Sequence, residues 1–155
     1  MDFTSAIKSG FSNYANFSGR ASRSEFWYWT LFAFILGYGL GFVDGILGVY
    51  IVDPYFVDPE MPEFGEVGGI GLFGGLASAV LLIPGLAITW RRLHDIDKSG
   101  AWWFILFTCI GAIFLIIWHA TKGTVGPNRF GPDPLGSGQA LRDPPAPGDG
   151  PSLEA

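Results

Sequence analysis

The chain has 155 residues, of which 49% are apolar, 16% aromatic and 15% charged, and its formal net charge is -5. A soluble domain carries about 25% charged residues, because polar groups must cover most of its surface. The composition therefore excludes a soluble monomeric enzyme, and the negative charge excludes a basic nucleic-acid-binding protein. A single cysteine, Cys109, excludes a framework of internal disulfides.

Near the N-terminus, apolar side chains recur at helical spacing, at Phe3, Ile7, Phe11 and Tyr14. This spacing predicts a short amphipathic helix over residues 3–15 that lies on the membrane surface. The alternative is a frayed polar terminus.

Three later stretches are long, apolar and almost free of charge, namely residues 26–50, 68–90 and 101–120. A helix needs about 20 apolar residues to cross the hydrocarbon core of a bilayer, so each stretch is long enough. Core helices of a soluble bundle are the alternative, but too few amphipathic helices remain to cover them. The predicted fold is all-α, a polytopic membrane domain over residues 1–134 with three transmembrane helices. Residues 135–155, rich in proline and glycine, are expected to be a disordered tail.

Ser22 and Glu25 have the spacing of a capping box, in which each side chain pairs with a backbone N–H at the start of a helix. We therefore expect the first membrane helix to begin there. Asp44 is the one charged residue within this stretch, and by helical rise it lies close to the outer interface. A role in proton transfer is therefore not favoured.

Basic residues indicate the orientation of the chain in the membrane. The connection 53–67 has no lysine or arginine and five acidic residues, whereas basic residues precede the first span and follow the second. The positive-inside rule therefore places the N-terminus and the loop 91–100 in the cytoplasm. Three spans would then put the tail outside. The alternative is a re-entrant hairpin around Gly111, which would return the tail to the cytoplasm.

Small residues recur every four positions in the first two spans. Such stripes let membrane helices approach closely, so we expect them to pack against each other or against a second copy of the chain. The alternative is that glycine is simply common in membrane helices. The two stripes are Gly37, Gly41 and Gly45, and Gly71, Gly75 and Ala79.

The adjacent His94 and Asp95 raise the question of metal or acid–base chemistry. A metal site needs three or four ligands, and the one other histidine, His119, lies across the membrane in the predicted topology. The chain also has no Gly-x-Ser-x-Gly nucleophile motif. We therefore expect no catalytic residue, metal ligand or cofactor.

Three motifs occur in order along the chain: Phe-Ser-Gly-Arg-Ala-Ser-Arg-Ser-Glu-Phe-Trp from Phe17, Arg-Arg-Leu-His-Asp from Arg91, and Gly-Pro-Asn-Arg-Phe-Gly-Pro-Asp-Pro from Gly126. Together they resemble the YhaH-like bacterial inner-membrane protein family, a domain of unknown function. The resemblance covers residues 17–134. It implies a small multi-pass protein of the bacterial cytoplasmic membrane and implies no reaction.

We expect two sets of residues to carry function. The first is a cytoplasmic cluster whose basic members are placed to meet anionic lipid headgroups, or alternatively serve only to orient the chain. It comprises Arg20, Arg23, Glu25, Arg91, Arg92, His94 and Asp95. Within it, Arg20 with Asp95 or Arg91 with Glu25 are predicted ion pairs. The second set is a compact surface turn, with Asn128, Arg129, Gly131 and Asp133.

The favoured function is a non-enzymatic inner-membrane protein that associates with lipids, with itself or with another membrane protein. One alternative is an accessory component of a transporter or channel. The other, less favoured, is a membrane enzyme that uses His94 and Asp95.

Overall fold

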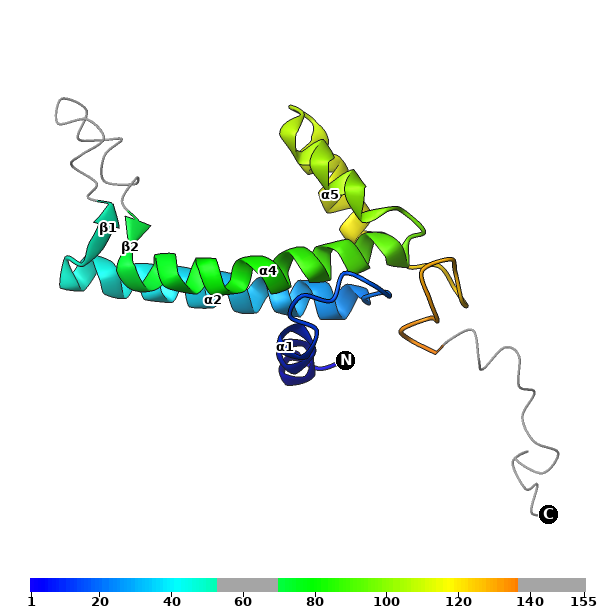
Figure 1. The fold of residues 1–155 in the computed structure, drawn as a ribbon, viewed down its shortest axis with the longest axis horizontal. Coiled ribbons are helices and arrows are strands. Elements are labelled where there is room, and N and C mark those ends of the chain that lie inside the picture. Colours follow the sequence, from blue (N-terminus) through cyan, green and yellow to red (C-terminus); the bar gives the residue numbers. More distant parts are fainter. Residues whose placement is uncertain (53–69, 137–155) are drawn as a thin grey trace, which may run out of the picture. The chain divides into compact units, whose positions relative to one another are not determined.

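A computed structural model describes residues 1–52 and 70–136 of the chain, and within these ranges the structure is mostly helical (Figure 1). The predicted acidic connection 53–67 and residues 137–155 of the predicted disordered tail lie outside the described residues. The chain divides into two compact units. Residues 1–17 and 24–88 form one unit, and residues 18–23 and the chain from Thr89 onward form the other.

Helix α1 spans Phe3–Ser12, within the range predicted for the amphipathic helix. Asp2 caps its start, because the carboxylate accepts a hydrogen bond from the Ser5 backbone N–H at 2.7 Å. Hydrogen bonding to Ser5 also lowers the pKa of the Asp2 carboxyl below its usual value. The helix ends at Ser12 because the Asn13 side chain donates to the Ser9 carbonyl at 3.0 Å.

Helix α1 packs against the first turns of α2, which spans Arg23–Leu47. Gly10 lies so close to Trp29 that a Cβ atom there would overlap the indole ring, and Trp29 is only 2% exposed. The Ser9 hydroxyl donates to the Glu25 carboxylate at 2.8 Å. One face of α1 is therefore held by contacts with α2. These contacts stabilise a helix that is too short to be stable by itself.

Helix α2 begins at Arg23, as the position of Ser22 predicts, and it ends at Leu47, before the predicted boundary at residue 50. Gly48 adopts a left-handed conformation with φ of 63°, and the Val49 N–H donates to the Asp44 carbonyl at 3.1 Å. This is the glycine-terminated cap that commonly closes a helix. Strand β1 follows at Tyr50–Val52 and pairs antiparallel with β2, Ile70–Gly71.

Helix α4 spans Leu72–Asp95, so it starts later and ends later than the predicted span 68–90. Its start is capped from α2. The buried Asp44 carboxylate accepts hydrogen bonds from the backbone N–H groups of Phe73 at 2.9 Å and Gly74 at 2.7 Å. A carboxylate at this position satisfies two of the unpaired N–H groups and complements the positive end of the helix dipole.

Pro84 lies inside α4 and, lacking an N–H, leaves the Val80 carbonyl without its helical partner. The Tyr14 hydroxyl fills this position by donating to the Val80 oxygen at 2.6 Å. The segment after α1 thus supplies the hydrogen-bond donor that the proline cannot provide within α4.

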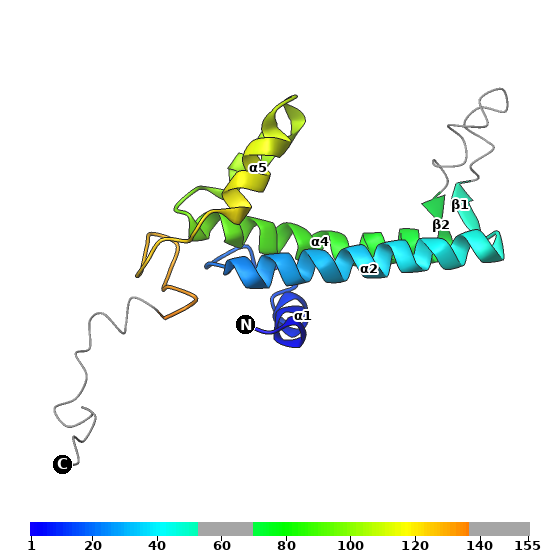
Figure 2. The ribbon, with the colours of Figure 1, turned by 180° about the vertical axis from the view of Figure 1, so that it is seen from behind.

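Helices α2 and α4 run side by side in both views of the molecule (Figures 1 and 2). With 25 and 24 residues, both are long and apolar enough to cross a membrane. Large apolar side chains of α2 remain open, since Phe42 is 71% exposed and Ile46 is 70% exposed. A soluble core helix would cover such side chains, so their exposure favours a lipid environment.

The single helix predicted over residues 101–120 is not found. The chain instead forms a 3-10 helix, η2, at Gly100–Phe107 and a separate α-helix, α5, at Gly111–Ala120. The Thr108 N–H donates to the Ile105 carbonyl at 2.9 Å and the Gly111 N–H donates to the Thr108 carbonyl at 3.1 Å, so the chain turns between them. Three transmembrane helices are therefore not confirmed.

Candidate functional site: a buried arginine–aspartate cluster

The centre of the second unit is a buried carboxylate held between two arginines. Asp95, in the last turn of α4, accepts from Nε of Arg20 at 3.0 Å and from Nη1 of Arg92 at 2.6 Å. The side chains of all three residues are at most 5% exposed. The ion pair between Arg20 and Asp95, with an Nη2–Oδ1 distance of 2.8 Å, confirms one of the two pairs predicted from the sequence.

Arg20 also joins the segment before α2 to the segment that follows α5. Its Nη1 atom donates to the Gly126 carbonyl at 2.6 Å and its Nη2 atom donates to the Thr124 carbonyl at 2.5 Å. The planar guanidinium thus binds three partners at once, namely a carboxylate and two backbone carbonyl oxygens. Replacement by lysine would retain the charge but not this arrangement.

Arg92 binds the carboxyl-terminal end of α5. Its Nε atom donates to the His119 carbonyl at 3.1 Å, and its Nη2 atom donates to the carbonyls of Trp118, at 3.4 Å, and Thr121. The last carbonyls of a helix have no partner within the helix and carry partial negative charge. A buried arginine there supplies both the missing hydrogen-bond donors and a positive charge. Arg92 is 0% exposed and acts as an internal cap.

His94 does not pair with Asp95. Its Nδ1 atom lies 3.0 Å from the Gly19 carbonyl, and its ring stacks on Phe130 with centroids 3.9 Å apart. The His94 carbonyl accepts from the Asn128 side chain at 2.8 Å. Histidine and aspartate therefore have separate structural partners, and this arrangement is not that of an acid–base pair.

The predicted surface turn is present, and its polar side chains stabilise it. The Asn128 oxygen accepts from the Phe130 N–H at 2.9 Å, and Asn128 and Gly131 exchange two backbone hydrogen bonds of 3.1 Å. Gly131 has a φ of 141°, which side chains disfavour. The Asp133 carboxylate accepts from the Gly126 N–H at 3.1 Å, and Arg129 pairs with the exposed Asp97 at 3.1 Å. This turn bonds to the end of α4 and so belongs to the cluster.

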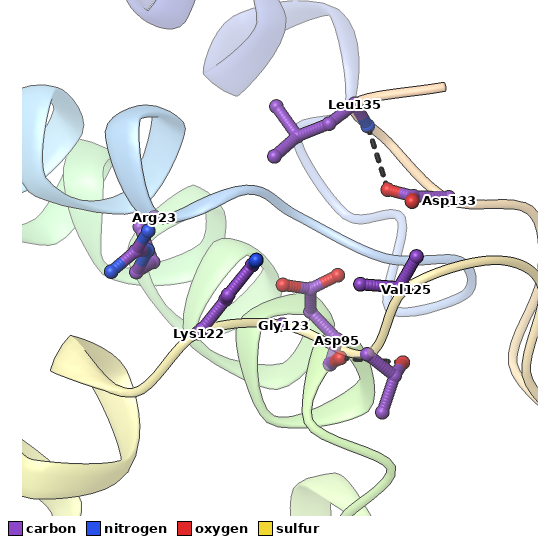
Figure 3. Close-up of a pocket in the computed structure, with 8 residues that line it drawn as sticks. Arg23, Asp95, Lys122, Gly123, Val125, Asp133 and Leu135 are labelled. Atoms are coloured by element: carbon purple, nitrogen blue, oxygen red, sulfur yellow. Dashed lines mark hydrogen bonds between the residues drawn. The ribbon is translucent and has the colours of Figure 1, made fainter. Parts of the chain in front are cut away.

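A small cavity of about 40 Å³ opens beside Asp95 (Figure 3). Its carboxylates already have partners, since Asp95 binds two arginines and Asp133 accepts from the N–H groups of Gly126 and Leu135. Its cations, by contrast, are exposed. Arg23 makes one long hydrogen bond of 3.5 Å, to the Ala120 carbonyl, and Lys122 has no ion pair among the residues that the structure describes. The lining residues are Arg23, Asp95, Lys122, Gly123, Thr124, Val125, Asp133 and Leu135.

The structure brings together most of the predicted cytoplasmic cluster. Arg20, Arg92, His94 and Asp95 join through the bonds above, and the Arg91 carbonyl accepts from the Ala21 N–H at 3.0 Å. Glu25 belongs to the other compact unit, where it binds Ser9, and its pairing with Arg91 stays a prediction. Sequence reasoning missed the contributions of Thr124, which bonds the Asp95 carbonyl through N–H and hydroxyl at 2.9 and 3.0 Å, and of Lys122.

The predicted glycine stripes contribute unequally to packing in the first unit. The close approach of α4 to α2 occurs at Gly74, where an added Cβ atom would lie 3.4 Å from the Gly41 backbone. A Cβ at Gly71 would overlap Asp44, whereas one at Gly37 would have nothing within 4 Å. Gly75 faces the side chains of Ile70 and Ile51. Packing of the open stripe against a second copy stays a prediction.

Comparison with known proteins places the chain in a family. Residues 14–132 match the family described as protein of unknown function (DUF805). The chain is 37% identical to inner membrane protein YhaH of Escherichia coli K12 over 124 residues, which cover 79% of this chain and 89% of YhaH. It is 37% identical over 123 residues to inner membrane protein YhaI of the same strain, covering 79% of this chain and 88% of YhaI. The uncharacterized protein YiiR of that strain is 26% identical over 144 residues, covering 76% of this chain and 85% of YiiR.

No solved structure matches the chain. The matched residues 14–132 include Arg20, Arg92, Asp95 and Asn128. The extent of this match and the identity to YhaH and YhaI show that the chain belongs to the DUF805 family.

Proposed function

We propose that the chain is a multi-pass protein of the bacterial inner membrane, which crosses the bilayer with α2 and α4 and binds anionic lipid headgroups at its cytoplasmic end. The length and open apolar surface of the two helices support the membrane location. The relatives YhaH and YhaI carry the name inner membrane protein, which supports the same location for this chain.

The charge of the described part of the second unit supports a cytoplasmic N-terminus. In residues 18–23 and 89–136, seven lysines and arginines stand against three aspartates, a net charge of +4, although the whole chain has a charge of -5. Positive charge collects on the cytoplasmic side of membrane proteins, which supports a cytoplasmic position for Arg20, Arg91 and the cluster between them.

One observation carries the headgroup proposal, namely the pair of exposed cations at the cavity. Arg20 and Arg92 are buried and fully engaged with Asp95, so they cannot reach a headgroup. Arg23 and Lys122 line the cavity with their charges exposed, while its carboxylates are occupied by other partners. A lipid phosphate there would gain about 1 kcal/mol from each basic residue near the membrane surface.

The test counts lipids bound to variants of the purified protein. The double variant Arg23→Gln, Lys122→Gln should lose about 2 kcal/mol of affinity for phosphatidylglycerol, or roughly 30-fold. Native mass spectrometry of detergent-solubilised protein, with phosphatidylglycerol or phosphatidylcholine added, measures the retained lipid. Arg129→Gln is the matched control, because this exposed arginine already pairs with Asp97. Equal retention of the two lipids by the wild type, or an equal loss in the control, would contradict the proposal.

A further inference from the structure

We infer that η2 and α5 form a re-entrant hairpin whose apolar side chains contact the acyl chains of one membrane leaflet, and that the chain on both sides of the hairpin lies at the same membrane face. The inference rests on the proposed membrane location. It goes further by giving the topology and by assigning a lipid-facing surface to residues 100–120.

The two arms of the hairpin fold back on each other. The rings of Trp102, near the start of η2, and Trp118, near the end of α5, meet edge to face with centroids 5.5 Å apart. Lys98, which precedes the hairpin, places its ammonium 4.5 Å from the centroid of the Trp118 ring. In one straight helix, residues 102 and 118 would lie about 24 Å apart. The cation–π contact therefore joins the two ends of the hairpin.

The base of the hairpin is fastened to the last turn of α4. Arg92 donates to the carbonyls of His119, Trp118 and Thr121 at the end of α5. Beyond α5, the Thr124 N–H donates to the Asp95 carbonyl at 2.9 Å. Residues on both sides of the hairpin thus share one hydrogen-bonded cluster, so they cannot lie on opposite faces of a bilayer.

The arms have the length of one leaflet. The eight residues of η2 rise about 16 Å and the ten residues of α5 rise about 15 Å, close to half of the roughly 30 Å hydrocarbon core. Large apolar side chains are exposed on both arms, with Phe107 77%, Ile113 60% and Ile116 60% exposed. On α5, the buried Gly111, Leu115 and His119 lie on one side, and exposed or partly exposed residues cover the rest of the helix. This surface is too broad for one helix to cover, so surrounding lipid is the occupant that fits.

A turn inside the hydrocarbon core must provide hydrogen-bond partners for its own backbone polar groups. The turn between η2 and α5 pairs several of them. The N–H and the hydroxyl of Thr108 both donate to the Ile105 carbonyl, at 2.9 and 2.7 Å. The N–H groups of Gly111 and Ile113 donate to carbonyls within the turn, at 3.1 and 3.2 Å. A Cβ atom at Gly111 would overlap the Ile105 carbonyl, so the fold-back requires glycine there.

Cross-linking tests the fold-back directly. In a Cys109→Ser background, the pair Trp102→Cys, Trp118→Cys is treated in native membranes with a short bismaleimide, and mass spectrometry measures the intramolecular product. We expect most of the protein to be linked, and the two single-cysteine variants to give none. A straight helix would give no product, and that result would overturn the inference.

Cysteine labelling tests the topology without altering the contact between the two arms. In the same background, single cysteines replace Ser99 and Pro134, which are exposed on the two sides of the hairpin, and Val52, beyond the far end of α2. A membrane-impermeant maleimide should label Ser99→Cys and Pro134→Cys from one face and Val52→Cys from the other. Labelling of Pro134→Cys from the face of Val52→Cys, or from both faces, would overturn the inference.

The two proposals fail separately. If alkaline carbonate extracts the protein from membranes, the membrane location is wrong and the inference falls with it. If the protein is retained and Ser99→Cys is labelled from outside, the proposed orientation is wrong, but the inference still stands as long as Pro134→Cys is labelled from that same side.

Discussion

Removal of the Asp95 carboxylate is the sharpest test of the cluster. Asp95→Asn keeps the size of the side chain and one acceptor oxygen, but it leaves two buried guanidinium groups without a counter-charge. Arg20 and Arg92 have side chains 1% and 0% exposed, so water cannot compensate. Breaking a buried ion pair by removing one partner costs about 3–5 kcal/mol. We therefore expect the folding equilibrium to fall by about 100- to 4,000-fold.

The assay is thermal unfolding of the purified protein in detergent micelles, followed by near-ultraviolet circular dichroism. For a chain of this length, each kcal/mol shifts the midpoint by about 2–4 °C, so Asp95→Asn should lower it by about 6–20 °C. Asp97→Asn is the matched control. Asp97 pairs with Arg129 at 3.1 Å, but the side chains are 51% and 62% exposed, so the pair contributes at most about 1 kcal/mol. Asparagine also tolerates the φ of 58° at this position.

Two results would refute this reasoning. Equal shifts for Asp95→Asn and Asp97→Asn would mean that burial does not set the strength of the pair. Additive losses in Asp95→Asn and Arg20→Gln would mean that the two groups act independently, whereas partners at 2.8 Å should show a double-variant loss well below the sum.

Further predictions concern the first unit. Tyr14→Phe should destabilise the protein by about 0.5–1.5 kcal/mol, because the Val80 carbonyl then lacks a donor. In a Pro84→Ala background, the N–H of the alanine can bond to Val80, so the same substitution should cost little. Thermal unfolding of the wild type, the two single variants and the double variant measures this. Gly74→Leu should destabilise by about 1–3 kcal/mol, because its Cβ would already lie 3.3 Å from the Asp44 carboxylate and 3.4 Å from the Gly41 backbone, which leaves little room for the rest of the leucine side chain. Gly37→Leu should have little effect, because nothing lies within 4 Å of a Cβ atom there. Equal unfolding midpoints for the two leucine variants would contradict this packing.

Local features of the sequence predicted the two long helices and the start of the first one. Hydropathy located both long helices, and the position of Ser22 located the first residue of α2, Arg23. The pairing of Arg20 with Asp95, 75 residues apart, also followed from the sequence. The prediction came from assigning both residues to the same predicted membrane face, where the sequence offers few counter-charges.

Features decided by packing between segments were not predictable in the same way. Residues 101–120 are apolar throughout, so hydropathy treats a straight helix and a hairpin alike. The difference lies in the contact of Trp102 with Trp118 and in the clash that a side chain at Gly111 would make with Ile105. Similarly, a four-residue period favoured Gly75, whereas the closest approach of the helices uses Gly74, beside the Asp44 cap.

The three motifs that carry the family resemblance are the three segments that the cluster joins, and this helps to separate structural from binding residues. Arg20, Asp95 and Asn128 are each held by two or more hydrogen bonds, at least one of which joins two segments, so the fold alone accounts for these side chains. Arg23 belongs to the first motif but is exposed, and its hydrogen bond to the Ala120 carbonyl is 3.5 Å long. The proposed headgroup binding would give this charge beside the cavity a role that its one long hydrogen bond does not. Arg23 and its neighbour in the cavity, Lys122, are therefore where a function beyond assembly should be sought first.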